Sequence, residues 1–338
     1  MSNESKFKHT LQQWELSERL RHQGKDQKSL VRKITYKIKK TRKEVASFFY
    51  INFLLHTKFK KTTPTISANN TAVAQTYTLG RHVNKCTLEN KKVLAVVIHA
   101  FYFDIFTRII EKTKSIGIPY ALYITTHKAI AQEVSSHIKL LGLDAHIEVY
   151  ENKGRDILPF LKIINLIKTN GHQVILKLHT KKSPHKFSKG RRWCDSMVDQ
   201  LLDASVIDKV IENFTTYPTI GLIAPHRHLH LLRYKGGSNM PHITELADKI
   251  GYQGNINQQS FVGGTMFYAR ANAFDSLLKL NIKDTDFKEE PIPMDGTLAH
   301  VIERTFGLAA NKEGLETVDT KFIKSLNKQS DNSHELIK

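Results

Sequence analysis

The chain has 338 residues, 40% of them hydrophobic, and a formal net charge of +19. This length allows one large domain with an extension, and the charge favours anionic partners such as nucleic acid, acidic lipid or phosphorylated small molecules. The two cysteines, Cys86 and Cys194, lack the spacing of a metal site, so we expect a reducing compartment and no disulfide framework. No apolar run approaches the length of a spanning helix and the N-terminus lacks a signal-peptide core, so we expect a cytoplasmic protein.

The first 90 residues differ in composition from the rest. We predict a basic helical N-terminal extension over 1–61 and a Thr-, Ser- and Asn-rich linker over 62–90. Within 32–61, ten Lys and Arg residues stand against one acid and frame the run FFYINFLL. This pattern is typical of an element that lies on the anionic inner face of the cytoplasmic membrane. A basic helix docked on the protein's own core, or an oligomer contact, is the alternative.

Strand-type and helix-type segments alternate from residue 92 onward. Continuous apolar runs predict buried strands, and apolar residues at helical spacing predict the helices between them. The expected elements are a strand at 93–100, a helix at 104–116, a strand at 120–125, a helix at 128–141, a strand at 145–150, a helix at 157–168 and a strand at 173–178. These repeats predict a single α/β domain over 91–320 with a mostly parallel central sheet, whose ligands bind at the carboxyl ends of the strands.

The pattern is looser after Pro184. We expect a helix over 194–214, a short strand over 220–224, a polar stretch over 227–260, a glycine turn into a strand over 261–270, and helices that begin at 271 and at Asp295. Residues 321–338 are expected to form a polar tail.

One charged glycine turn, Glu151-Asn152-Lys153-Gly154-Arg155-Asp156, follows a predicted strand and opens onto a helix. Gly154 permits a positive φ and close approach of a ligand, and the helix N-terminus favours anions. Asp156 is expected to cap the helix. A capped turn with solvated charges explains the same residues. We favour a functional interpretation because other predicted strands also end in unusual polar residues: His99, Thr125 and 179–183.

Positive charge recurs after the predicted strands, and Lys and Arg suit a diphosphate. The basic residues are Lys153, Arg155, Lys181, Lys182, Arg191 and Arg192. The chain has no nucleophile elbow, no Walker loop and no dinucleotide fingerprint. His226, His228 and His230 alternate without a nearby carboxylate or cysteine, so an exposed loop is favoured there over a metal site. Asp295 or Glu303 is suited to be the base for an incoming hydroxyl, although an ordinary N-cap also explains Asp295.

Five segments resemble one known family: VVIHAFY, YENKGRDILPFL, LKLHTKKS, GGTMFYAR and MDGTLAHVIERTFG. Together, over about residues 93–310, they are similar to rhamnan synthesis protein F, a family of bacterial glycosyltransferases of surface-polysaccharide assembly. The resemblance implies transfer of a sugar, rhamnose or a related one, from a nucleotide donor to a growing capsule, lipopolysaccharide O-antigen or rhamnan.

The order of motifs is also similar to A-type glycosyltransferases, whose fourth strand ends in an Asp-x-Asp pair of metal ligands. The matching place reads His179-Thr180-Lys181, so we expect no metal or other cofactor and infer that the lysine takes over part of the metal's charge neutralisation. GGTMFYAR is similar to the segment that lines the donor pocket in that fold, and Asp295 falls near its acceptor-side base.

We therefore expect a peripheral-membrane, nucleotide-sugar-binding glycosyltransferase that acts on a glycan or lipid-linked glycan acceptor and binds no nucleic acid. Its expected donor-binding residues are His99, Glu151, Asn152, Lys153, Gly154, Arg155, Asp156, His179, Thr180, Lys181, Gly264 and Arg270. Asp295 is the expected catalytic base, with Glu303 as the second candidate. The alternatives are a non-catalytic polyanion or nucleic-acid binder, for which no recognition module is present, and a two-domain B-type glycosyltransferase.

Overall fold

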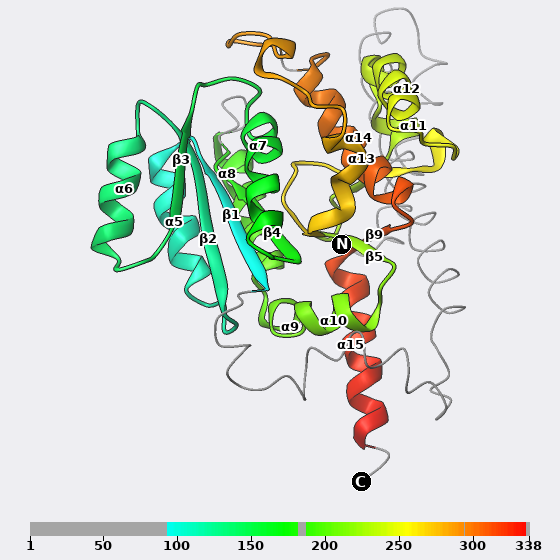
Figure 1. Cartoon of the computed structure of the whole chain (residues 1–338). Helices are drawn as coiled ribbons and strands as arrows, with labels where there is room; N and C mark the ends of the chain where they lie inside the picture. Colours follow the sequence, from blue (N-terminus) through cyan, green and yellow to red (C-terminus); the bar gives the residue numbers. More distant parts are fainter. Residues whose placement is uncertain (1–92, 182–186, 294, 336–338) are drawn as a thin grey trace, which may run out of the picture. The chain divides into compact units, whose positions relative to one another are not determined.

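The computed structural model describes residues 93–181, 187–293 and 295–335 (Figure 1). The predicted extension, linker and basic segment, all within residues 1–90, lie outside this range. The described part contains a seven-stranded sheet in the order β3-β2-β1-β4-β8-β5-β9 and a separate ribbon of β6 and β7. The strands are β1 (Leu94–Ala100), β2 (Tyr120–His127), β3 (His146–Tyr150), β4 (Val174–His179), β5 (Ile220–Ala224), β6 (Leu229–Leu231), β7 (Ser260–Val262), β8 (Phe267–Arg270) and β9 (Glu316–Asp319).

The seven-stranded sheet is mostly parallel, as predicted. Strand β8 alone runs antiparallel to its neighbours β4 and β5, whereas β1, β2, β3 and β4 are parallel to one another and β9 is parallel to β5. The chain is therefore a mixed α/β protein. A two-domain B-type arrangement requires two doubly wound sheets, and the described residues form one such sheet.

Helices cover both faces of this sheet. The right-handed connections β1–α5–β2 and β2–α6–β3 move in one direction and β3–α7–β4 moves back past β1, so α7 lies opposite α6 (Figure 1). The helices are α5 (Phe103–Thr113), α6 (Ala131–Leu140), α7 (Ile157–Thr169), α8 (Phe187–Leu201), α9 (Ala204–Ile207), α10 (Val210–Thr216), α11 (Leu232–Lys235), α12 (Met240–Lys249), α13 (Asp275–Leu278), α14 (Leu298–Lys312) and α15 (Thr320–Glu335). Short 3₁₀ turns are η3 (Gly237–Asn239), η4 (Ile256–Gln258), η5 (Ala271–Phe274) and η6 (Asp284–Asp286). None of the described helices is long and apolar enough to cross a membrane.

The core joins α7 and α14 to the middle of the sheet through four phenylalanines. Their ring centroids lie 5.1–6.1 Å apart, mostly edge to face, a favourable geometry for aromatic pairs. They are Phe160 of α7, Phe267 of β8, Phe274 of η5 and Phe306 of α14. Helix α14 thereby becomes a central element, in contact with strands that are distant in the sequence.

Several expected boundaries after residue 184 are wrong. The helix expected over 194–214 is divided into α8, α9 and α10, because the Asp203 carboxylate accepts from the Ser205 amide and starts a new helix. The expected helix from 271 is a 3₁₀ turn followed by α13. The polar stretch over 227–260 contains α12, whose apolar face is buried.

The tail expected at 321–338 is instead helical as far as Glu335. Three apolar side chains, those of Phe322, Ile323 and Leu326, are buried, so the beginning of α15 belongs to the core. Because few apolar residues spread over a polar helix give a weak periodic signal, composition alone obscured this element.

Gly154 combines a positive φ with tight packing, which generates a testable prediction. A methyl group there would lie 2.6 Å from Leu158 Cβ and 2.8 Å from Phe287 Cδ1, whereas one at Gly142 meets nothing within 4 Å. Both residues have φ above 60°. We expect Gly142→Ala to cost about 1–2 kcal/mol of unfolding free energy from backbone strain, and Gly154→Ala a further 1–3 kcal/mol from overpacking. Urea unfolding measures both, and equal losses would contradict the packing argument.

Candidate functional site at the carboxyl edge of the sheet

The candidate site lies where the strand order reverses. The chain proceeds from β1 outward to β2 and β3, and then returns to place β4 on the other side of β1. His99 near the end of β1 and His179 at the end of β4 are register partners. In open α/β sheets, ligands bind outside the carboxyl ends of the strands at such a switch point.

Asp156 enters this region from the turn after β3. Its side chain makes no N-cap hydrogen bond, so the predicted capping role is wrong. The carboxylate Oδ2 instead accepts hydrogen bonds from Lys177 Nζ at 2.6 Å and Thr265 Oγ1 at 2.6 Å, and lies 3.4 Å from His179 Nδ1. Burial raises the pKa of Asp156, but the neighbouring His179 and Lys177 and the two hydrogen bonds outweigh it, so the pKa lies well below its ordinary value.

Lys177 is a residue of the candidate site that was not predicted from the sequence. It lies inside β4, is 1% exposed, and its ammonium also donates to the Thr265 carbonyl at 2.9 Å. The same ammonium lies 5.3 Å and 5.9 Å from the ring centroids of Phe160 and Phe267. Burial lowers its pKa, which the Asp156 carboxylate partly offsets. One signal was visible beforehand, because a lysine interrupts the apolar run VILKLH and a buried lysine requires a partner.

The two strand-end histidines are neutral near pH 7. Burial lowers the pKa of His99 to about 4 and that of His179 to about 3. His99 Nδ1 lies 2.9 Å from Thr125 Oγ1, and His179 Nδ1 faces Asp156. Neutral imidazoles are hydrogen-bonding groups rather than cations, so these residues add no positive charge to the site.

The two residues that follow β4 differ in exposure. Thr180 is buried, and its Oγ1 accepts from the amides of Phe101 and Tyr102 at 2.8 Å and 3.0 Å, so it joins β4 to the end of β1. Lys181 is partly exposed, and its Nζ lies 4.6 Å from the Trp193 ring centroid. Among the residues that the structure describes, no carboxylate forms an ion pair with Lys181.

The charged turn over 151–155 is engaged by a distant segment. Lys153 Nζ donates to Glu289 at 2.6 Å, and Arg155 donates to the Pro293 carbonyl at 3.2 Å and lies 3.1 Å from His300 Nε2. Glu151 and Asn152 are exposed and Gly154 is buried. The turn therefore meets Lys177, His179 and Thr265 through Asp156, while the charges of Lys153 and Arg155 face residues 289, 293 and 300.

Gly264 and Glu303 add a carboxyl group to the same edge. The Gly264 amide donates to Glu303 Oε1 at 3.1 Å, in a turn whose φ of +94° suits glycine. A methyl group at Gly264 would lie 2.8 Å from the Trp193 ring, so the turn and the ring beneath Lys181 are in close contact. Burial raises the pKa of Glu303 above its ordinary value, while the Lys181 charge opposes this shift.

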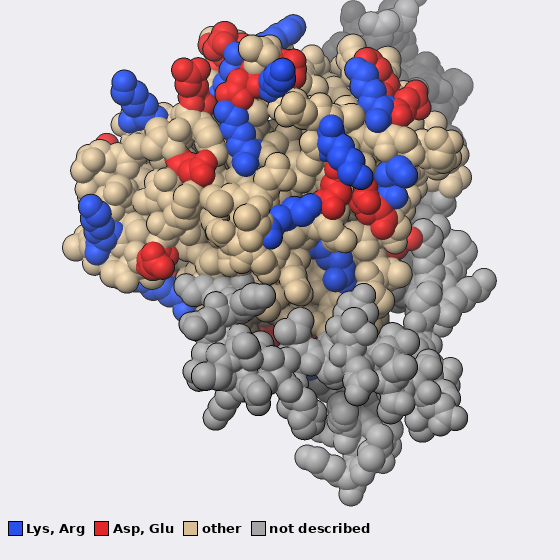
Figure 2. Space-filling model, viewed as in Figure 1, with Lys and Arg blue, Asp and Glu red and all other residues tan. Residues whose placement is uncertain are grey.

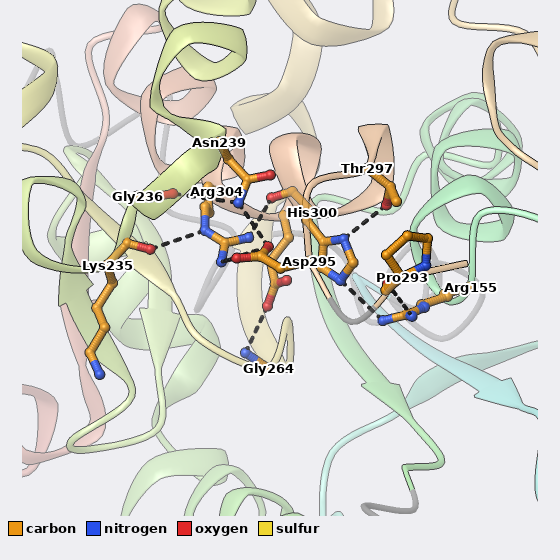
Figure 3. A network of polar contacts seen from close by, with 11 residues as sticks. Arg155, Lys235, Gly236, Asn239, Gly264, Pro293, Asp295, Thr297, His300 and Arg304 are labelled. Carbon is orange, nitrogen blue, oxygen red and sulfur yellow. Dashed lines mark hydrogen bonds and ion pairs between the residues drawn. The ribbon is translucent and has the colours of Figure 1, made fainter. Parts of the chain in front are cut away.

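Asp295 has a different environment (Figure 3). It precedes α14, whose N-cap residue is Thr297, so neither the expected helix start at Asp295 nor its role as an N-cap is correct. Asp295 Oδ1 accepts from Asn239 Nδ2 at 2.7 Å and lies 3.2 Å from Arg304 Nη2. Partial burial raises the pKa of Asp295, but the Asn239 hydrogen bond and the Arg304 charge outweigh it and leave the pKa below its ordinary value.

Arg270 lies away from this site. It pairs with Val174 at the start of β4, at the opposite edge of the sheet from His179. Its guanidinium donates to backbone carbonyls, those of Ile220 at 2.7 Å, Tyr217 at 3.2 Å and Phe214. The expectation that Arg270 binds the donor is therefore corrected: its contacts tie the sheet to the end of α10. Within the described part of the chain, no group of three or more His, Cys, Asp or Glu residues is placed to hold a metal ion.

The buried pair generates a stability prediction. We expect Lys177→Met to lower the free energy of unfolding by about 3–5 kcal/mol, because it leaves the Asp156 carboxylate without its charge partner. Lys181→Met, the same change at a partly exposed position, is expected to stay within about 0.5 kcal/mol. The double variant Lys177→Met, Asp156→Asn should lose less than Lys177→Met alone. Denaturant unfolding tests this order, and an equal effect of the two lysine variants would contradict it.

Residues 30–315 match the family described as rhamnan synthesis protein F. Two curated relatives, from two strains of Xanthomonas campestris pv. campestris, are each 37% identical over 219 residues and are both named uncharacterized protein WxcX. That match covers 65% of this chain and 31% of each relative, so the chain spans about a third of the length of these relatives. No solved structure matches the chain. Because the family match extends over most of the sequence, the chain belongs to the rhamnan synthesis protein F family, whose name connects it with polysaccharide synthesis.

Proposed function

We propose that this protein is a glycosyltransferase that moves a sugar, rhamnose or a related one, from a nucleotide-sugar donor to a growing bacterial surface polysaccharide. The observation that carries the proposal is that an ammonium group, Lys181, and a carboxyl group of raised pKa, Glu303, both adjoin the contact of Trp193 with Gly264, beside the switch point of an α/β sheet. Membership of the rhamnan synthesis protein F family supports the substrate class.

In this proposal, Lys181 binds the diphosphate of the donor. It is a partly exposed cation at the end of β4, and the indole of Trp193 holds its ammonium by a cation–π contact. A lysine ammonium is a point charge that neutralises phosphate oxygens. This charge would serve the leaving diphosphate without a divalent metal. His99 and His179, being neutral, would contribute hydrogen bonds to donor hydroxyl groups.

Glu303 is the better candidate for the base, and Asp295 the weaker one. A catalytic base works best when its pKa lies near the working pH, and burial moves Glu303 in that direction. Asp295 is paired with Arg304 and its pKa is lowered, which makes it a weaker proton acceptor. Glu303 would take the proton of the acceptor hydroxyl. That oxygen would then bond to the anomeric carbon as the bond to the nucleoside diphosphate breaks, with inversion as the expected outcome.

The same proposal covers the fold type, the acceptor and the location. We propose an A-type glycosyltransferase arrangement, a glycan or lipid-linked glycan as acceptor, and a cytoplasmic protein held at the inner face of the membrane through residues 32–61. Residues 1–92 contain 20 Lys and Arg against 6 Asp and Glu, whereas residues 93–338 contain 31 against 26. The positive charge is thus concentrated outside the α/β part, as attraction to an anionic surface requires.

A polyanion binder is the second candidate, because the chain is strongly basic. On the face shown in Figure 2, however, Lys and Arg side chains are interspersed with Asp and Glu. Binding through a uniform basic surface would weaken steeply with salt, whereas saturable stabilisation by one nucleotide sugar supports the transferase.

A thermal-shift screen tests the proposed function. UDP-glucose, GDP-mannose and dTDP-rhamnose would be added in the presence of a chelator, and one of them is expected to stabilise the protein by about 2.7 kcal/mol at 100 times its dissociation constant. Lys181→Met should lose this stabilisation because the diphosphate loses its counter-charge. No stabilisation by any nucleotide sugar, or stabilisation that needs Mg²⁺ or Mn²⁺, would contradict the corresponding part of the proposal.

The role of Glu303 makes a separate kinetic prediction. We expect Glu303→Gln to reduce turnover by about 10²–10⁴-fold, because the amide cannot accept the proton, while donor affinity is retained. Turnover of the wild type should rise with pH as Glu303 loses its proton, at a pH above the ordinary pKa of glutamate. Initial rates between pH 4 and 9 measure this. If the rate of Glu303→Gln still falls at low pH in the same way as that of the wild type, Glu303 is not the base.

A further inference from the structure

We propose that Asp295 binds the acceptor glycan, by accepting hydrogen bonds from its hydroxyl groups, in the glycosyl transfer proposed above. This inference rests on the proposed function. It assigns a binding role to Asp295, a carboxylate distinct from the proposed base, Glu303. It names a subsite for an uncharged, polyhydroxylated ligand between α14 and the segment that contains η3 and α12.

The carboxylate of Asp295 is held from two separate elements (Figure 3). Asn239, at the end of η3, donates from Nδ2 to Oδ1 at 2.7 Å, and Arg304, in the second turn of α14, lies 3.2 Å away. Two hydrogen-bonding partners from different elements fix both the position and the orientation of the carboxylate. Such preorganisation lowers the entropic cost of binding a ligand.

The two partners are themselves anchored. Arg304 donates to the carbonyls of Lys235 and His300 at 3.2 Å and 3.0 Å, and its guanidinium lies 5.5 Å from the Phe261 ring centroid. Asn239 is fully buried, and the partner it supports, Asp295, is not. The arrangement is therefore a buried support beneath an accessible carboxylate.

The side chain of Asp295 remains 46% exposed despite these contacts. An ionised carboxylate has about four acceptor sites, and Asn239, Arg304 and the Gly296 backbone amide occupy about three of them. The remaining acceptor capacity belongs to this half-exposed carboxylate and suits the hydroxyl donors of a sugar ring. Hydrogen bonds to a charged acceptor are stronger than neutral ones, which gives a single carboxylate a measurable share of glycan affinity.

Asp295 also lies close to the proposed base. Arg304 connects the two carboxyl groups, because it contacts Asp295 directly and its charge also acts on Glu303, the residue before it in α14. A glycan hydrogen-bonded to Asp295 would therefore lie near Glu303. The alternative is that Asp295 serves only as an ion pair that joins α14 to the segment around Asn239.

The decisive experiment separates the Michaelis constant for the acceptor from turnover. With saturating donor and a rhamnose trisaccharide as acceptor, we expect Asp295→Asn to raise the acceptor KM by about 10–100-fold, with kcat and donor affinity unchanged, as for loss of uniform binding. Asp284→Asn is the matched control, because Asp284 is a paired aspartate of similar exposure, 50%, whose partner is Lys162. It should leave the acceptor KM unchanged.

A second variant separates binding from a structural ion pair. Asp295→Glu keeps the negative charge near Arg304 but displaces the carboxylate oxygens. A structural ion pair would be restored and the acceptor KM would return to the wild-type value, whereas a binding group would retain a raised KM. Thermal unfolding of each variant establishes that the fold is intact.

Two outcomes would overturn the proposal: a fall in kcat with an unchanged acceptor KM, which identifies Asp295 as the base, or no change in either constant. Direct titration with the trisaccharide in the absence of donor distinguishes a failure of the subsite from a failure of the proposed transfer reaction. If the wild type binds the trisaccharide and Asp295→Asn binds it more weakly, the subsite stands even when no transfer occurs. If the wild type does not bind the trisaccharide, the subsite is rejected, whatever the thermal-shift screen shows.

Discussion

The buried contact between Asp156 and Lys177 is the constraint on which the candidate site depends. Its charges lie among the phenylalanines of the core, where an unpaired charge is costly, so the two side chains must meet. The contact draws the turn after β3 toward the middle of β4, and the bonds to Thr265 attach the turn before β8 to the same point. Three segments distant in the sequence are thereby held at one edge of the sheet.

The two carboxylates near α14 illustrate how environment divides roles between like groups. Glu303 has a backbone amide as its hydrogen-bond partner and a raised pKa, whereas Asp295 has an arginine and an amide side chain and a lowered pKa. Environments that push the pKa values of neighbouring groups apart are typical of acid–base sites. The sequence suggested the opposite ranking, because Asp295 stood at an apparent helix start and Glu303 inside a helix.

Local patterns predicted the first half of the sheet well. The strands and helices from 93 to 179 follow their apolar periodicity, because each buries a face that is continuous in the sequence. The switch-point rule also led to His99, Asp156, His179 and Lys181, and the structure places the first three at one edge of the sheet, while their roles in binding stay predictions. Arg270 was misplaced because β8 is antiparallel, so the end of β8 lies at the opposite edge of the sheet. The sequence of so short a strand does not show whether the strand is parallel or antiparallel.

Composition, periodicity and motifs were sufficient to predict the α/β class, the parallel arrangement of the early strands, the family and the basic N-terminal region. The partners of the charged residues became known only from the three-dimensional structure. Lys177 contacts Asp156, Arg155 contacts His300, and Asp295 contacts both Arg304 and Asn239. These choices depend on distances between segments up to 145 residues apart in the chain, and on the cost of burying a charge, which no local pattern records.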